Sequence, residues 1–111
     1  MQANVILIGS MGLGSGNEEL GGLILANFLR LLGERDDLPK YIILWNEGVK
    51  IAIKDSIWIN HLKKLEERGV EIISCQTCIE YFQLEGLMAV GRIGTMVQIQ
   101  KILFTNPVLT V

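Results

Sequence analysis

The chain has 111 residues, of which 50% are hydrophobic, and its formal net charge at pH 7 is -2. Domains of about 100–150 residues are the commonest size, so we expect a single domain spanning residues 1–111 with a sizeable core. The small negative charge argues against a nucleic-acid or anionic-membrane surface, and no apolar run approaches the roughly 20 residues that cross a bilayer.

The first predicted elements are a buried strand and a helix joined by a glycine-rich loop. Residues 5–8 form a continuous apolar run typical of a parallel strand, and residues 9–16 are too rich in glycine for regular structure. Asn17 is expected to cap a helix that ends near residue 32. Because apolar residues occur around most of this helix, we expect it to be buried on two sides, against the sheet and against a neighbouring subunit.

The rest of the chain alternates strands with helices. We predict strands at residues 41–45, 70–74, 87–90 and 107–111, and helices at residues 55–68, 77–84 and 96–104. Asp55 or Ser56 is expected to cap the second helix, Gly69 to end it, and Thr95 to cap the last helix. This alternation predicts a mainly parallel sheet of about five strands with helices on both faces.

The two cysteines, Cys75 and Cys78, form a C-x-x-C motif at the end of the predicted strand 70–74. In parallel α/β sheets, working residues gather at the carboxyl ends of the strands. A thiolate at the start of a helix is stabilised by the helix dipole, and a second thiol one turn later can reach it. The motif would therefore allow disulfide exchange, or a persulfide on Cys75 that Cys78 displaces. Two inert core cysteines are the alternative.

Metal binding is the weaker interpretation of the cysteine pair. A zinc site needs four ligands, and only His61, on the second predicted helix, is available beyond the pair. We therefore expect no metal and no cofactor. The first residues lack the positive segment of a signal peptide, and two cysteines three residues apart cannot close a long stabilising loop. Both features predict a cytoplasmic protein whose thiols are kept reduced.

Two loops at the same edge of the sheet are candidates for binding an anion or a partner. The glycine loop fits neither G-x-G-x-x-G nor the P-loop, but backbone N–H groups at the start of the first helix could bind an anion. The candidate residues are Gly12, Gly14, Gly16 and Asn17 in the first loop, and Asn46 and Glu47 in the second. A flexible or closely packed glycine loop is an equal alternative. Glu47 could in principle act as a general base near the thiols, but the favoured interpretation of Glu47 is a solvated loop carboxylate. If the first and third strands are neighbours, the thiols lie beside the glycine loop.

Residues 69–78 resemble the DsrE-like domain of YedF-type proteins, which are proposed sulfurtransferase-like factors linked to sulfur and selenium metabolism. Further similar segments cover nearly the whole chain, namely residues 5–10, 12–14, 19–21, 39–40, 46–50, 65–70, 89–91 and 95–96. The resemblance implies a three-layer α/β/α fold, a homo-oligomer and a persulfide on Cys75. It also matches Cys78 to the second cysteine of the YedF type.

The chain differs from that family in two respects. Where the wider DsrE group has basic residues and a glycine after the cysteine, this chain continues with residues 79–86, IEYFQLEG. YedF-type proteins also carry a TusA-like domain before the DsrE-like one, and the sequence here contains none. A separate TusA-like sulfur-carrier protein is therefore a candidate partner.

Three functions remain open at this point. The leading hypothesis is a sulfur or selenium carrier, or a sulfurtransferase, in which Cys75 holds the sulfur and Cys78 assists or resolves it. The second is a non-catalytic, homo-oligomeric assembly domain, suggested by the apolar first helix. The third is a thiol–disulfide oxidoreductase, although the cysteines lack the Trp-Cys-Gly-Pro-Cys context of thioredoxin-like enzymes.

Overall fold

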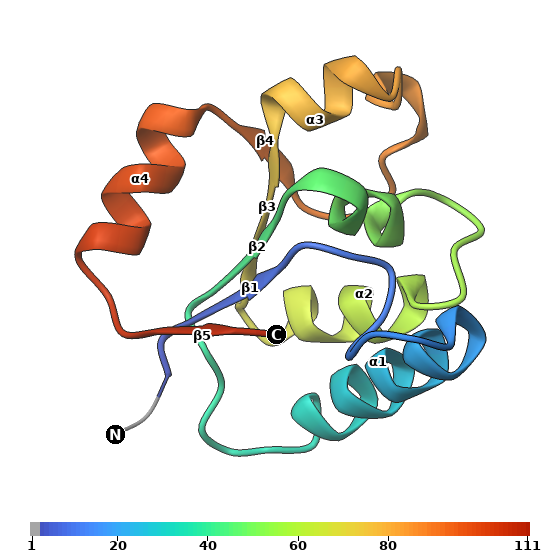
Figure 1. The fold of residues 1–111 in the computed structure, drawn as a ribbon. Helices are drawn as coiled ribbons and strands as arrows, with labels where there is room; N and C mark the ends of the chain where they lie inside the picture. The colour runs from blue at the N-terminus through green and yellow to red at the C-terminus, as the bar shows by residue number, and fades with distance from the viewer. Residues whose placement is uncertain (1–2) are drawn as a thin grey trace.

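The structure, a computed structural model, describes residues 3–111 and is organised around a five-stranded, all-parallel sheet in the order β4-β3-β2-β1-β5 (Figure 1). The strands are β1 (Val5–Ile8), β2 (Tyr41–Leu44), β3 (Glu71–Cys75), β4 (Arg92–Gly94) and β5 (Val108–Thr110). The α-helices are α1 (Glu18–Leu32), α2 (Ile59–Glu67), α3 (Gln76–Tyr81) and α4 (Met96–Phe104), and the 3-10 helices are η1 (Asn46–Ala52) and η2 (Glu85–Leu87). The predicted three-layer α/β/α fold is confirmed.

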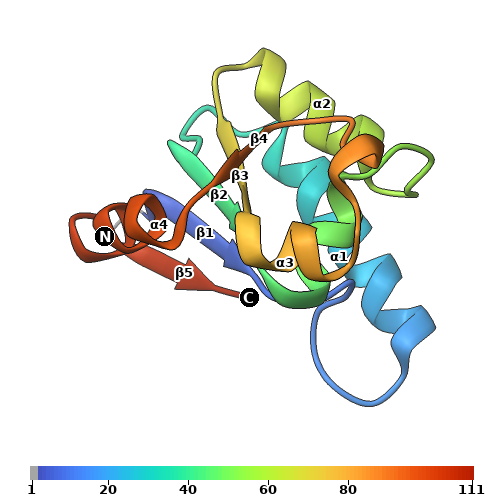
Figure 2. The same cartoon turned by 90° about the horizontal axis from the view of Figure 1, so that it is seen from above.

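The strand order explains which face each helix covers. Connections between neighbouring parallel strands are almost always right-handed. The chain moves in one direction from β1 through β2 and β3 to β4, so its crossover helices α1 and α2 share one face of the sheet (Figures 1 and 2). The last connection runs back across the sheet to place β5 beside β1. As a result, α4 lies on the opposite face.

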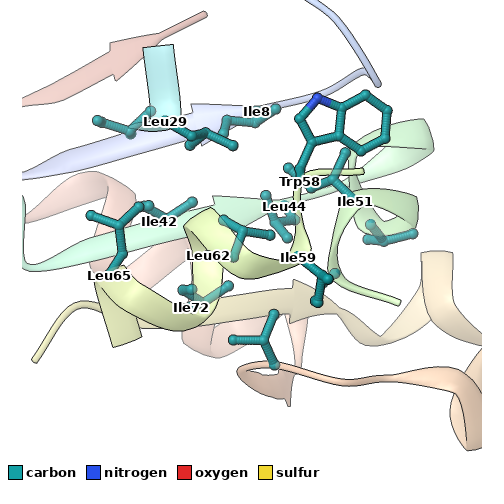
Figure 3. Close-up of a cluster of buried hydrophobic side chains, with 14 of the residues drawn as sticks. Ile8, Leu29, Ile42, Leu44, Ile51, Trp58, Ile59, Leu62, Leu65 and Ile72 are labelled. Atoms are coloured by element: carbon teal, nitrogen blue, oxygen red, sulfur yellow. The ribbon is translucent and has the colours of Figure 1, made fainter. Parts of the chain in front are cut away.

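The core is divided unequally between the two faces, because successive residues of a strand point to opposite sides. The larger core, drawn in Figure 3, joins strand residues to α1, α2 and η1; labelled members include Ile8, Leu29, Ile42, Leu44, Ile51, Leu62, Leu65 and Ile72. The smaller core consists of Val5, Leu7, Ile43, Ile73, Cys75 and Ile99. Cys75 thus belongs to the thinner side of the sheet, under α4.

Three predicted helix-end signals are confirmed. The Asn17 side chain accepts a hydrogen bond from the Leu20 N–H at 2.8 Å and caps α1. Thr95 and Gln98 form a capping box at α4, with each side chain bonded to the other residue's backbone N–H. Gly69, with φ +95°, follows α2 in the left-handed conformation that commonly ends a helix.

The predicted start of α2 is wrong. The helix begins at Ile59, so neither Asp55 nor Ser56 caps it. The Ser56 hydroxyl instead donates to the Ile51 carbonyl oxygen at 2.6 Å, back toward η1. The segment between η1 and α2 is therefore a turn that the apolar pattern alone could not place.

The predicted fourth strand at residues 87–90 is also wrong. Its Met88 makes only an isolated antiparallel bridge with Ile53, and the sheet is completed by β4, at residues 92–94. The helix predicted to reach residue 84 ends earlier, because Gln83 adopts a left-handed backbone with φ 56°. Both errors fall in the connection from β3 to β4, where local turns interrupt the apolar pattern.

Candidate functional site

Cys75 is the last residue of β3 and immediately precedes α3. Its side chain is only 2% exposed and packs in the smaller core. The alternation of side chains along β3 that buries Ile73 on this face buries Cys75 on the same face two residues later. The thiol that the resemblance assigns as the persulfide carrier is therefore covered in a single copy of the chain.

Cys78 lies one turn later in α3 and is partly exposed. Its Sγ accepts a hydrogen bond from the backbone N–H of Asn46 at 3.1 Å. Asn46 opens η1 at the carboxyl end of β2 and has φ 53°, a left-handed conformation that asparagine tolerates better than most residues. Both thiols are free, so the pair is in its reduced form.

Burial and neighbouring groups act on the Cys78 thiol in opposite directions. Burial raises its pKa, and the adjacent Cys75 raises it further. The N–H of Asn46 lowers the pKa in part, because a donor to sulfur stabilises the thiolate. The net effect is a raised pKa for the Cys78 thiol, which favours its protonated form at neutral pH.

The 3-10 helix η1 is held against α3 beside the thiols. The Nζ of Lys50 lies 2.7 Å from the Glu47 carboxylate and 4.3 Å from the centroid of the Phe82 ring. An ammonium over an aromatic face is attracted by the ring's electrons. Glu47, considered as a general base, is therefore engaged in an ion pair in this structure.

A cleft of about 830 Å³ opens at the glycine loop, within the size range of small-ligand sites. Its lining includes Gly12, Gly14, Gly16, Asn17, Glu18, Glu19, Glu47, Ile57 and Trp58. The base of the loop is held tightly to α1, because the Leu13 N–H donates to the Gly21 carbonyl at 3.0 Å. A Cβ on Gly12 would lie 2.7 Å from the Gly21 carbonyl carbon, so only glycine fits there.

The charge around the cleft does not match the anion expected from the glycine loop. Glu18, Glu19 and Glu47 line it, and the described lining residues include no lysine or arginine. The carboxylates of Glu18 and Glu19 repel an anion, and that of Glu47 is balanced by Lys50, so the cleft favours a cationic or neutral ligand. Glu18 and Glu19 also occupy the first turn of α1, where negative side chains are favoured by the helix dipole.

The sheet separates the two candidate regions. β2 lies between β1 and β3, so the thiols are not directly beside the glycine loop. The loop after β2 joins the regions instead: Asn46 contacts Cys78, and Glu47 lines the cleft. Of the six predicted loop residues, the structure brings five around the cleft and places Asn46 at the thiols.

Sequence reasoning missed two features of these regions. It named Asn46 as a loop candidate but not as a backbone donor to a thiol; the signal available was an asparagine, tolerant of left-handed backbone, at a strand's carboxyl end. The second is Trp58, a residue of the larger core that also borders the cleft. The Trp58 indole N–H donates to the Gly22 carbonyl at 3.0 Å, and its ring forms part of the cleft.

Within residues 3–111, no group of three or more His, Cys, Asp or Glu side chains is placed to hold a metal ion. None of the helices in this described part of the chain combines the length and hydropathy needed to traverse a bilayer.

No protein-family model and no curated protein matches the chain. Solved structures do share its fold. The ychN protein from E. coli superposes with a TM-score of 0.71 at 18% identity, covering 99% of this chain and 100% of that one. A protein of unknown function from Methanobacterium thermoautotrophicum, MTH1491, gives a TM-score of 0.68 at 14% identity, covering 96% of each chain.

A third similar structure is BT1422, a conserved protein of unknown function from Bacteroides thetaiotaomicron. Its TM-score is 0.63 at 20% identity, with coverage of 97% of this chain and 95% of that chain. At these identities the likeness establishes the fold over essentially the full described length. It leaves the chemistry to be argued from the residues of this chain.

Proposed function

We propose that this chain is a carrier of sulfane sulfur or selenium, or a sulfurtransferase, working through the Cys75–Cys78 pair. The supporting observation is two free thiols, one helical turn apart at the carboxyl end of β3, with Cys78 partly exposed and hydrogen-bonded to the Asn46 N–H. The resemblance of residues 69–78 to the DsrE-like domain of YedF-type proteins is the second support.

The exposures of the two thiols favour an order of events. A donor persulfide, R–S–SH, reaches Cys78 more readily than Cys75, which is 2% exposed. The Cys78 thiolate attacks the outer sulfur of the donor, whose S–S bond breaks and releases R–S⁻. The Cys75 thiolate then takes the same outer sulfur from Cys78, which is restored as a thiolate. Each transfer forms one S–S bond and breaks one, so no external oxidant or reductant is consumed.

Delivery follows the same chemistry. The sulfane sulfur returns from Cys75 to the thiolate of Cys78, and the thiolate of an acceptor protein then attacks it on Cys78, the more exposed of the two thiols; each step again forms one S–S bond and breaks one. A TusA-like carrier is the candidate acceptor. Attack of Cys78 on the inner sulfur of Cys75 is the competing outcome; it releases hydrosulfide, forms the Cys75–Cys78 disulfide and requires a thiol reductant to restore the pair.

Intact-protein mass spectrometry after incubation with glutathione persulfide tests the proposal. We expect the wild-type chain to gain one sulfur atom. Cys78→Ala should load at least about tenfold more slowly. Cys75→Ala should load on Cys78 and keep the sulfur there, because the transfer from Cys78 to Cys75 is no longer possible. The matched control is the chain with both substitutions, which should gain nothing. A wild-type chain that stays unmodified, or a double variant that loads equally, would contradict sulfur transfer.

A second candidate function, a non-catalytic assembly domain, is favoured by the exposed apolar side chains of α1, among them Leu20, Leu23 and Leu31. Under that hypothesis the thiols are incidental. The chain carrying both Cys75→Ala and Cys78→Ala should then complement a deletion strain fully. A complete loss of complementation, with the fold intact by circular dichroism, would count against the assembly function.

A further inference from the structure

The backbone N–H of Asn46 reaches the sulfur of Cys78 from a distant part of the chain. The two residues are 32 positions apart, and the amide nitrogen lies 3.1 Å from Sγ. Cys78 is the more exposed of the two thiols and receives the sulfur first in the order of events set out above. The Asn46 amide therefore contacts the atom that meets the substrate.

The Asn46 amide is held in place by the end of β1. The Trp45 N–H donates to the Ile8 carbonyl oxygen at 3.2 Å, and the Gly48 N–H donates to the Trp45 carbonyl at 3.0 Å. Gly48 also packs so closely on the Ile8 carbonyl that a Cβ there would collide with it. Asn46 turns the chain between these anchored residues with φ 53°. A donor that is fixed beforehand needs no rearrangement when charge develops on its acceptor.

Burial of Cys78 opposes its ionisation, and the Asn46 N–H opposes the effect of burial. Burial raises the Cys78 pKa, the Asn46 N–H lowers it, and Cys75 raises it further. The Asn46 N–H is the stronger of two influences that lower this pKa, the other being the backbone of Cys78 itself. The charged side chains on α3 and on the elements packed against it are Glu80 on α3, Glu47 and Lys50 on η1, Glu71 on β3 and Arg92 on β4. Glu47 and Lys50 pair with each other.

The Cys78 sulfur carries negative charge twice in the proposed transfer. After its proton passes to the solvent, the Cys78 thiolate attacks the outer sulfur of R–S–SH; one S–S bond forms, the donor's S–S bond breaks, and R–S⁻ leaves. The Cys75 thiolate then attacks the same outer sulfur, and Cys78 departs as a thiolate with the electron pair of the broken bond. A hydrogen-bond donor at Sγ stabilises the anion in both steps.

We propose that the Asn46 backbone N–H is the thiolate-stabilising group of this site, for Cys78 as nucleophile and as leaving group, and that the left-handed backbone at residue 46 keeps it directed at Sγ. The reaction to which this applies rests on the proposed function, whereas the contact acts on the thiol whether or not sulfur is transferred. The Asn46 side chain matters only for its tolerance of positive φ. Glycine shares that tolerance and should replace it without loss, whereas a β-branched residue should not.

The pH dependence of Cys78 alkylation by iodoacetamide tests the contact. All variants carry Cys75→Ala, so that Cys78 is the only thiol. Adding Asn46→Val should lower the alkylation rate at neutral pH about tenfold and move the midpoint of the profile to higher pH, with the same limiting rate at alkaline pH. Asn46→Gly is the matched control and should leave the profile unchanged. A valine profile equal to that of the parent, or a glycine profile shifted as far as the valine one, overturns the proposal.

Circular dichroism establishes that each variant is folded. Asn46→Ala resists positive φ less than valine does and takes its place in the comparison if the valine variant does not fold. Its profile should shift in the same direction by a smaller amount, and an alanine profile identical to that of the parent would then overturn the proposal.

Loading with glutathione persulfide separates this role from the proposed function. In the chain with both cysteines, Asn46→Val should take up sulfur about tenfold more slowly than the wild type, and Asn46→Gly at the wild-type rate. A shifted alkylation profile in a chain that takes up no sulfur would retain the effect of Asn46 on the thiolate and overturn sulfur transfer. Equal loading by all three proteins, with unshifted alkylation profiles, would overturn the role of Asn46 and leave the proposed function intact.

Discussion

The thiol region and the glycine-loop region share the carboxyl edge of the sheet but differ in openness. At β3 the chain passes directly from Cys75 into α3, and Cys75 is 2% exposed. At β1 the chain runs through residues 9–17 before α1 begins, and a cleft of about 830 Å³ remains. With no loop between β3 and α3, Cys75 keeps the buried position of a strand residue, whereas the long glycine-rich connection after β1 has few side chains to fill the space beside it.

This difference bears on where chemistry can occur. Position at the carboxyl edge brings residues near the usual ligand-binding side of a parallel sheet, but it does not expose them. The two thiols lie in the closely packed region at the end of β3, which we call the closed region. The space for a ligand lies in the cleft at the glycine loop, which we call the open region. The loop after β2, through Asn46 and Glu47, is the structural link between them.

The largest expected effect comes from a substitution in η1, the segment that carries Asn46 and Glu47. A Cβ added at Gly48 would collide with the Ile8 carbonyl oxygen and lie 3.0 Å from its carbon, where η1 passes the end of β1. Gly48→Ala should destabilise the fold by about 3 kcal/mol through overpacking against rigid backbone. Gly86→Ala, where a Cβ meets nothing within 4 Å, is the control. Urea unfolding measures both, and equal midpoints would refute the close packing at Gly48.

The reactivity of the two thiols tests whether Cys75 is less accessible than Cys78. The Cys75→Ala chain, which retains Cys78, should react with an aromatic disulfide reagent at least about tenfold faster than the Cys78→Ala chain, because Cys75 is buried. Absorbance of the released thiol gives both rates. Denatured samples of the two variants should react alike, and equal rates in the native state would contradict the difference in exposure.

Loss of the α1 cap probes the open region. Asn17→Ala removes the hydrogen bond to the Leu20 N–H and should cost about 1 kcal/mol of stability. Asn17→Ser retains a capping oxygen and should restore most of it. Chemical unfolding of the three proteins measures the ranking. A fully stable alanine variant would mean that the glycine loop does not rely on this cap.

Ser74 offers a smaller test beside the thiols. Its hydroxyl is buried on β3 and has no hydrogen-bond partner among the described residues. Ser74→Ala should therefore be neutral or stabilising by up to about 1 kcal/mol, because an unsatisfied buried hydroxyl is costly. A marked loss of stability on unfolding would indicate that the hydroxyl has a partner, such as a buried water.

The smallest expected effect is a pH dependence of stability. The folded state raises the pKa of the Cys78 thiol, so it holds that proton more tightly than the unfolded chain does. The corresponding stability is present at neutral pH and is lost as the pH rises through the alkaline range. Relative to the wild type, Cys78→Ala should lose less stability between neutral and alkaline pH. Urea unfolding of both proteins at several pH values measures this. An unfolding free energy that changes with pH equally in the two proteins would contradict it.

The amino-acid sequence by itself determined the local features of this protein. Continuous apolar runs specified the central strands, Asn17 and Thr95 specified helix starts, and the C-x-x-C motif lay at a strand end as expected. These features depend on residues a few positions apart, whose preferences act before any distant contact forms. The short edge strand β4 escaped sequence prediction, because its Arg92-Ile93-Gly94 sequence has little apolar pattern.

Only the tertiary structure decided how the local features combine. It placed β2 between the thiol strand and the glycine-loop strand, buried Cys75 more deeply than Cys78, and brought Trp58 to the cleft beside Gly22. It also showed which apolar side of α1 one chain leaves uncovered. Each of these results depends on contacts between segments far apart in the chain, and such contacts leave no local pattern from which strand order or exposure can be predicted.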